Sequence, residues 1–181
     1  ESILTGKHKT GTDRIFEAFK KLKKENIKYV LNLQGDEPMI DSKDILNLNN
    51  LMIENNSDIG TLACKINEDS ILNNKNAVKV IVKEKLKNHS FTKALKFSRK
   101  ILSKESFYIY HHIGIYAYKV SVLERFVNLN QTENEIENRL EQLRALDNNI
   151  SISVALANSS PIGIDTKEDF VAIKKIMEYK S

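Results

Sequence analysis

The hydrophobic residues of the chain follow two alternating periods along its length. Short apolar runs rich in β-branched and aromatic residues predict buried strands over residues 29–33, 59–66, 77–82, 112–118 and 150–156. Between these runs, apolar residues recur with the spacing of amphipathic helices. The chain has two prolines, no internal repeat and no low-complexity linker, so we expect one domain over residues 1–181.

Four helices are predicted, each opened by a polar residue that can cap its N-terminus. The predicted caps are Thr12 for the first helix, Asp41 or Ser42 for the second, Thr132 with Glu135 for the third, and Thr166 with Asp169 for the fourth. The predicted apolar faces are Ile15, Ala18, Phe19 and Leu22; Ile45 and Leu48; Ile136, Leu140, Leu143 and Leu146; and Phe170, Ile173 and Ile176 or Met177. This alternation predicts an α/β sandwich around a mixed or parallel sheet.

Composition narrows the classes of function. The chain has 28 Lys and Arg against 24 Asp and Glu, and acidic residues interrupt its scattered lysines. No aromatic platform accompanies the basic residues, so we expect no nucleic-acid partner. No apolar run approaches the roughly 18 residues of a membrane span, and no signal-peptide pattern is present, so we expect no membrane insertion. The single cysteine, Cys64, rules out an intramolecular disulfide, and we expect a cytoplasmic location.

The most informative segment is the loop over residues 34–38, QGDEP, directly after the first predicted strand. It places Asp36 and Glu37 at the carboxyl end of a buried strand, where open α/β sheets bind ligands. Gly35 is expected to allow a sharp turn and the close approach of a ligand. An aspartate here can hold Mg²⁺, which takes one or two protein carboxylates together with phosphate oxygens. The alternative is a turn whose acids only cap the next helix.

A second acidic element lies far away in the sequence, over residues 163–169. Thr166 and Asp169 are explained by helix capping, whereas Asp165 precedes the cap. If the last strand lies beside the strand over residues 29–33, Asp36 and Asp165 could share one site for a metal ion and phosphates. The alternative is that Asp165 is a surface residue.

Two further segments carry polar side chains whose placement is informative. His112, Gly114 and Tyr116 share one face of the predicted strand by its period of two, and the two ring side chains suit hydrogen bonding to a polar ligand. Ordinary strand packing is the alternative. Zinc is disfavoured because no third nitrogen or sulfur ligand stands near the two adjacent histidines. Glu141 and Gln142 flank the leucines of the third helix, where a solvated face is the alternative.

Taken in order, these segments and three others resemble the CMP-Kdo synthetase family, where Kdo is 3-deoxy-D-manno-octulosonate. The matching stretches are residues 8–14 (HKTGTDR), 34–38 (QGDEP), 76–80 (NAVKV), 97–99 (FSR), 112–116 (HIGIY), 140–144 (LEQLR) and 163–169 (GIDTKED). The ordered set spans nearly the whole chain and is far more specific than any one of its motifs.

The resemblance implies a glycosyltransferase-A-like nucleotidyltransferase fold, a Rossmann-like three-layer sandwich with a mixed sheet. In that family the anomeric hydroxyl of Kdo attacks the α-phosphate of CTP and pyrophosphate leaves, a reaction that serves lipopolysaccharide synthesis. By resemblance, Asp36 and Asp165 hold Mg²⁺, and Arg99 completes the catalytic set as a fork for the sugar carboxylate. The implied Kdo-binding residues are Gln34, Arg99, His112, Tyr116, Glu141 and Gln142, and the implied nucleotide-binding residues are Thr10, Gly11, Thr12 and Arg14.

The chain departs from the family pattern at several places. The N-terminal strand and phosphate-binding loop of the family have no counterpart, because residues 1–5 already resemble the approach to the first motif. We therefore expect an N-terminally truncated fold with an unpaired sheet edge, and little or no activity from this chain alone. The loop after Arg99 is reduced to residues 100–104. Asn138 replaces a glutamate of the family, and Thr132 and Glu133 replace a Ser-Pro pair.

Three functions stay open at this point. The first is Kdo cytidylyltransferase activity, with CTP and Kdo as substrates and a homodimer implied by the resemblance. The second is a related transferase for another sugar acid such as a sialic acid, which the stretch over residues 140–144 disfavours. The third is a non-catalytic remnant of a split gene that acts as an interaction module.

Overall fold

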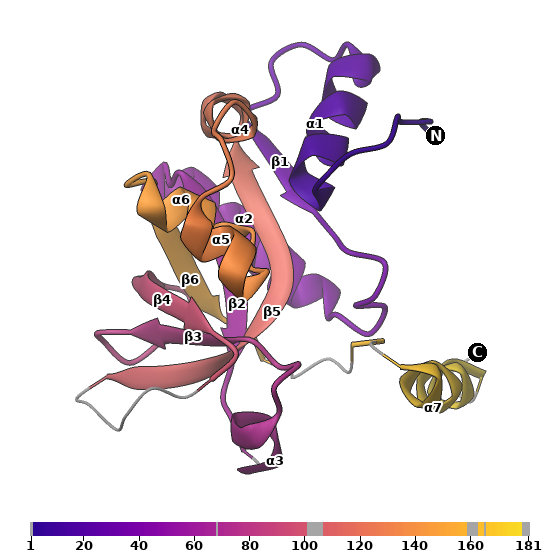
Figure 1. The fold of residues 1–181 in the computed structure, drawn as a ribbon, viewed down its shortest axis with the longest axis vertical. Helices are drawn as coiled ribbons and strands as arrows, with labels where there is room; N and C mark the ends of the chain where they lie inside the picture. Colours follow the sequence, from indigo (N-terminus) through magenta and orange to yellow (C-terminus); the bar gives the residue numbers. More distant parts are fainter. Residues whose placement is uncertain (1, 68, 101–106, 159–162, 165, 179–181) are drawn as a thin grey trace.

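The structure, a computed structural model, describes every residue except 1, 68, 101–106, 159–162, 165 and 179–181. The described residues form a mixed six-stranded sheet with helices on both faces (Figure 1). The strands are β1 (Tyr29–Asn32), β2 (Ile59–Cys64), β3 (Lys79–Val82), β4 (Phe91–Ser98), β5 (Tyr108–Lys119) and β6 (Ile152–Leu156). The helices are α1 (Gly11–Leu22), α2 (Ser42–Asn55), α3 (Asp69–Asn73), α4 (Val120–Val127), α5 (Glu133–Asn138), α6 (Gln142–Asp147) and α7 (Lys167–Glu178).

The strands lie in the order β1-β5-β2-β6-β4-β3, and β3 also pairs with β5. β2 and β6 are parallel, and the other pairs are antiparallel. The long strand β5 pairs with β3 through residues 108–111 and with β1 through residues 116–119. The segment of β5 between these two pairings is residues 112–115, so the motif over residues 112–116 lies where β3 ends and β1 begins to pair with β5.

The core has two halves, one on each face of the sheet, which gives the three predicted layers. On one face, α2 packs Leu48, Leu51 and Met52 against apolar residues of β2, β5 and β6. On the other face, α4 packs Leu123 and Phe126, together with residues of α6, against the opposite side of the sheet. Figure 1 shows α5 and α6 in front of the sheet and α2 behind it. No described helix combines the length and the apolar character that crossing a bilayer requires.

The cap of the first helix differs from the prediction. α1 begins after Thr10, whose hydroxyl accepts the backbone N–H of Asp13 at 3.2 Å. Thr12, the predicted cap, is buried inside the helix, and its hydroxyl lies 3.3 Å from the hydroxyl of Tyr118. The prediction failed because two threonines separated by one residue offer the same capping signal. Asp41 caps α2, and both predicted capping boxes are present.

The third predicted helix is in fact two short helices, α5 and α6. Arg139 adopts a left-handed backbone conformation with φ of 53°, which ends α5. The N–H of Leu140 then donates to the carbonyl of Glu135 at 3.2 Å. Ile136, predicted to face the core, is therefore 58% exposed.

The last helix, α7, stands apart from the sheet in Figure 1. Of its predicted inner face, Ile173 is buried, whereas Phe170 and Met177 are 55% and 50% exposed. These residues, with Pro38 and Ile164, line an apolar cavity of about 450 Å³. Of the predicted inner face, Phe170 and Met177 are thus left largely uncovered by the rest of the described chain.

Candidate functional site

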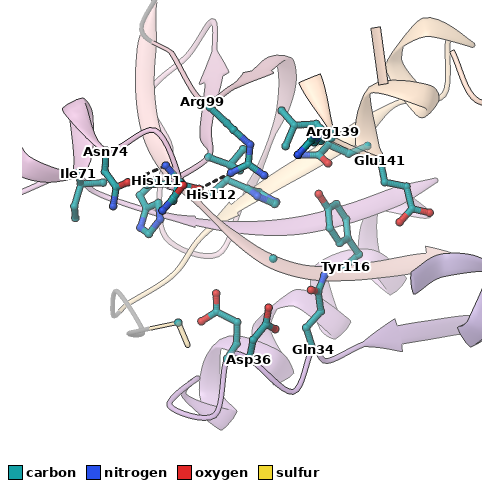
Figure 2. A pocket seen from close by; sticks show the side chains of 18 of the residues that line it. Gln34, Asp36, Ile71, Asn74, Arg99, His111, His112, Tyr116, Arg139 and Glu141 are labelled. Carbon is teal, nitrogen blue, oxygen red and sulfur yellow. Dashed lines mark hydrogen bonds between the residues drawn. The ribbon is translucent and has the colours of Figure 1, made fainter. Parts of the chain in front are cut away.

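A cavity of about 680 Å³ lies over the middle of β5 (Figure 2). It brings together segments from distant parts of the sequence, and Asp36 lies on its wall. All six residues predicted to bind the sugar acid line it, namely Gln34, Arg99, His112, Tyr116, Glu141 and Gln142. Figure 2 shows Gln34 and Asp36 on one side of β5 and Arg99 and Arg139 on the other.

A second cavity of about 410 Å³ adjoins the first. Three of the four predicted nucleotide-binding residues line it, namely Gly11, Thr12 and Arg14, whereas Thr10 is occupied as the cap of α1. The side chains common to both cavities are Gln34, Tyr116, Glu141 and Gln142. The two predicted residue sets therefore lie at two neighbouring cavities. The four side chains common to both, all from the sugar-acid set, form a shared wall that we call the partition.

The face of β5 that meets the first cavity carries His112, Gly114 and Tyr116, as the period of two predicted. The hydroxyl of Thr61 donates to the carbonyl of Ile115 at 2.7 Å, and it has only one proton to give. His112 Nε2, 2.9 Å from that hydroxyl, is therefore the donor of the bond between them. This tautomer leaves His112 Nδ1 as an acceptor for a ligand hydroxyl.

The two ring side chains on this face are electrically neutral. Burial, helped by the charge of neighbouring His111, lowers the pKa of His112 to about 3. Burial, with Tyr118 and Glu141 nearby, holds the pKa of Tyr116 well above its usual value. The Tyr116 ring lies 5.4 Å from the His112 ring and stacks on Tyr118 at 5.9 Å. The face thus offers hydrogen-bonding groups without charge, as a polyhydroxy ligand requires.

The Asp36 loop is held by the segment that comes before α7. The N–H of Ile164 donates to the carbonyl of Asp36 at 2.8 Å, and Gly163 lies beside Glu37. Asp165 itself lies outside the described residues. The turn predicted at Gly35 is present, because the N–H of Glu37 donates to the carbonyl of Gln34 at 3.2 Å. The φ of Gly35 is not positive, so the backbone at this turn does not require glycine. A Cβ at Gly35 would meet open space, so the loop leaves room in front of it.

The acidic residues of the cavity suit a hard cation only in part. Asp36, Glu37 and Asp169 all line its wall. Among the described residues, however, no three His, Cys, Asp or Glu side chains gather closely enough to hold a metal ion. Mg²⁺ fits such a donor set, because it typically binds one or two carboxylates and takes its other oxygens from substrate phosphates and water.

Arg99 lies at the end of β4, where its guanidinium Nη1 donates to the carbonyl of Asn76 at 2.6 Å. One nitrogen of the Arg99 guanidinium is thus held by the protein main chain. Sequence reasoning gave no role to several other polar residues of the wall, which are Lys65, Asn67, Asn74, Asn76 and Arg139. For Asn76 a signal existed, since it begins the motif over residues 76–80. For the others no local pattern points to the cavity.

Glu141 stands in the partition, directly before α6. Burial raises the pKa of its carboxyl group, although the hydroxyls of Thr12 and Thr10 pull in the opposite direction. Its Oε1 atom is buried and has no hydrogen-bond partner among the described residues. Such an atom costs free energy when left alone, so it is suited to pairing with a ligand hydroxyl.

Comparisons with known proteins agree with this site. A sequence profile of the cytidylyltransferase family matches residues 2–152. The 3-deoxy-manno-octulosonate cytidylyltransferase of Thermodesulfovibrio yellowstonii is 42% identical over 188 residues, which cover 98% of this chain and 73% of that protein. The protein of the same name from Bartonella bacilliformis is 38% identical over 171 residues, covering 94% of this chain and 70% of its own length.

Solved structures give the same result. A CMP:2-keto-3-deoxy-manno-octonic acid synthetase in complex with CTP superimposes with a TM-score of 0.82 at 30% identity, covering 96% of this chain and 70% of that one. A 4-diphosphocytidyl-2C-methyl-D-erythritol synthase from Anaerococcus prevotii shares the fold with a TM-score of 0.56 at 15% identity, covering 94% of this chain and 65% of its own. With the ordered motifs, the two adjoining cavities and these relatives in agreement, the chain belongs to the 3-deoxy-manno-octulosonate cytidylyltransferase family of nucleotidyltransferases.

Proposed function

We propose that the chain binds CTP and Kdo in its two adjoining cavities for the transfer of CMP from one to the other. The low activity expected of this chain alone stays a prediction. The observation that carries this proposal is that the two predicted residue sets line two adjoining cavities with a shared wall. The sugar-acid residues line the cavity of about 680 Å³, and three of the nucleotide residues line the cavity of about 410 Å³. A reaction between two bound ligands needs this adjacency, because positioning supplies much of the rate of nucleotidyl transfer.

The chemistry of the first cavity suits a sugar acid. Kdo carries one carboxylate and several hydroxyls, so its site needs a cation and many neutral hydrogen-bonding groups. Arg99 is the proposed partner of the carboxylate. His112 Nδ1, the Tyr116 hydroxyl and the Glu141 carboxyl are the proposed partners of hydroxyl groups, and the amides of Gln34 and Gln142 can both donate and accept.

In the reaction, the anomeric oxygen of Kdo forms a bond to the α-phosphorus of CTP while the bond to the pyrophosphate oxygen breaks. The hydroxyl loses its proton to water, and the pyrophosphate leaves with the electron pair of the broken bond. We propose that Asp36 and Asp165 hold Mg²⁺ at this point. The ion would neutralise phosphate charge and lower the pKa of the attacking hydroxyl, which makes a protein base unnecessary.

The biosynthetic role, the location and the oligomeric state are proposed from the same membership of the family. A CMP-Kdo product serves lipopolysaccharide assembly, so we propose a role in that synthesis, in the cytoplasm. We also propose a homodimer. These three proposals rest on membership of the family.

The test combines binding and turnover. Calorimetric titrations of CTP and of Kdo into the chain with Mg²⁺ are expected to show one site for each ligand, and ³¹P NMR reports any CMP-Kdo and pyrophosphate formed. Asp36→Asn is expected to keep the affinity for Kdo, because its acid side chain lies away from the proposed carboxylate partner, and to abolish any turnover. A chain that binds neither ligand, or that prefers a sialic acid over Kdo in competition, would rule out the proposed activity.

A further inference from the structure

Beside the first cavity, the fold buries a lysine. Lys79 begins β3 and is 1% exposed, among the largest fully buried side chains of the described chain. It does not line the cavity, and the salt bridges of the described residues include none to its ammonium. Burying a charge costs free energy unless hydrogen bonds compensate it, so the hydrogen bonds of the Lys79 ammonium indicate its role.

The ammonium of Lys79 joins two segments of the cavity wall. Its Nζ donates to the carbonyl of Asn74 at 2.6 Å and to the carbonyl of Arg99 at 3.0 Å. The first segment is the turn between α3 and β3, and the second is the end of β4. The Arg99 guanidinium also binds the 74–76 turn, because it donates to the carbonyl of Asn76. Three hydrogen bonds therefore tie Arg99 to the 74–76 turn at both its main chain and its side chain.

This arrangement has a cost that a purely structural role does not explain. Two cations lie close together, and burial together with the charge of Arg99 lowers the pKa of Lys79. An apolar side chain would fill the same space without that repulsion. An anion bound to the Arg99 guanidinium would offset this repulsion, because it lowers the positive charge next to the buried Lys79 ammonium.

We propose that Lys79 is a positioning residue: its ammonium fixes the Arg99 main chain and the 74–76 turn so that the guanidinium is presented to the carboxylate of the sugar acid. The inference rests on the proposed function for the identity of the acid. The positioning itself rests on the three hydrogen bonds. An arginine held in place loses less conformational entropy when it binds a carboxylate than one free to rotate.

The experiment is a double-mutant cycle on Kdo binding, measured by calorimetry with wild type, Lys79→Met, Arg99→Met and the double variant. Lys79→Met is expected to weaken Kdo binding about tenfold, the effect of losing one well-placed charged hydrogen bond. In the Arg99→Met background the same change is expected to have no further effect, because Lys79 acts through Arg99. The dissociation constant of CTP should change by less than about twofold.

A second readout does not depend on any ligand. In ¹⁵N NMR of the arginine side chains, the Arg99 signal of the free chain is expected to shift and broaden in Lys79→Met. Lys96→Met, an exposed lysine on β4, is the matched control and should leave both the signal and the Kdo affinity unchanged. If Lys79→Met does not fold, Lys79→Gln replaces it, because its amide still donates one hydrogen bond, and an intermediate loss is expected.

The outcomes separate the two proposals. If wild type binds Kdo and Lys79→Met leaves its affinity unchanged, or the two changes are additive, the positioning role is wrong. If wild type does not bind Kdo while the Arg99 signal still depends on Lys79, the positioning role stands and the proposed function is wrong.

Discussion

At the residue scale, the protonation of His112 is the feature that most affects the site. Its ring donates to Thr61 and is buried, so a second proton would have to be accommodated without water. Because burial lowers its pKa to about 3, the folded chain keeps the ring neutral where an unfolded chain would charge it.

This difference predicts a pH dependence of stability. Between pH 6.5 and about 3 the unfolded state binds one proton more at this residue, so the free energy of unfolding should fall as the pH falls, by about 1.4 kcal/mol per pH unit. Above pH 6.5 the residue contributes no slope. Urea unfolding between pH 7 and 5 measures the effect, and His112→Gln should lack it.

The matched control is the exposed His89, and His89→Gln should keep the wild-type slope. The pH range stops at 5 because Glu17 titrates lower. Its hydrogen bonds from Lys21, Gly6 and His8 lower its pKa to about 2. A His112→Gln variant with an unchanged slope would show that the ring is protonated in the fold.

At the scale of elements, α5 and α6 are joined by an ion pair that is almost completely buried. Arg144 Nε and Nη2 donate to the two carboxylate oxygens of Glu135 at 2.8 and 2.6 Å. The guanidinium also lies 4.7 Å from the ring centre of Phe126. Burial would raise the pKa of Glu135, but hydrogen bonds from Arg144 and Gln131 hold it below its usual value.

Breaking this pair is predicted to destabilise the fold strongly. Arg144→Met leaves the Glu135 carboxylate buried without its partner, so the free energy of unfolding should drop by about 3 to 5 kcal/mol. Adding Glu135→Gln should restore most of the loss, because the amide is neutral and keeps the capping box of α5. Chemical denaturation of the single and double variants measures this, and equal losses in both would contradict it.

β2 and α2 approach each other closely at Gly60. A Cβ there would lie 2.5 Å from Met52 Sδ and 3.0 Å from Leu48 Cδ1, both on buried side chains. Gly60→Ala is therefore predicted to reduce the free energy of unfolding by about 1 to 3 kcal/mol through overpacking. Gly11→Ala is the matched control, since a Cβ at Gly11 meets nothing within 4 Å. Similar urea midpoints for the two variants would show that α2 moves aside easily.

The strands and helices also show how much of the fold the sequence alone predicts. Five strands were predicted because their runs are rich in β-branched and aromatic residues. β4 was missed, since lysines, Ala94 and Leu95 give it a composition that suits a helix as well, and three of its eight residues are exposed. α4 was missed because Lys119 precedes it without a side-chain cap. Its existence depends on burying Leu123 and Phe126, which is tertiary information.

The same limit applies to the site. Residues whose positions follow from the predicted strands were found, such as Asp36 in the loop after β1 and His112 within β5. Asn74 and Arg139 were not, because the first reaches the cavity through the pairing of β3 with β5 and the second through the break between α5 and α6. Pairing register and helix breaks arise from contacts between distant segments, which a local pattern does not contain.

At the scale of the whole molecule, β1 pairs with β5 on one side only within the described chain. Beside it, α1 and β1 line an apolar groove of about 320 Å³ that includes Phe19, Leu22 and Ile27. Ile27 is 40% exposed. An unpaired edge next to exposed apolar side chains favours pairing with another strand.

We therefore predict that the isolated chain associates as its concentration rises. Ile27→Lys places a charge beside the edge and should shift sedimentation toward the monomer. Leu95→Lys, which changes an exposed leucine of β4 that is 46% accessible, is the control and should leave the association unchanged. A wild-type chain that stays monomeric at high concentration would contradict the prediction.

The partition between the two cavities has a consequence for the order of events. Gln34, Tyr116, Glu141 and Gln142 contact both spaces, so a molecule that orders these side chains from one side lowers the entropy lost when the other side is filled. The two occupants should then increase each other's affinity by the same factor, as thermodynamic linkage requires. Sharing these four side chains makes each ligand an effector of the other.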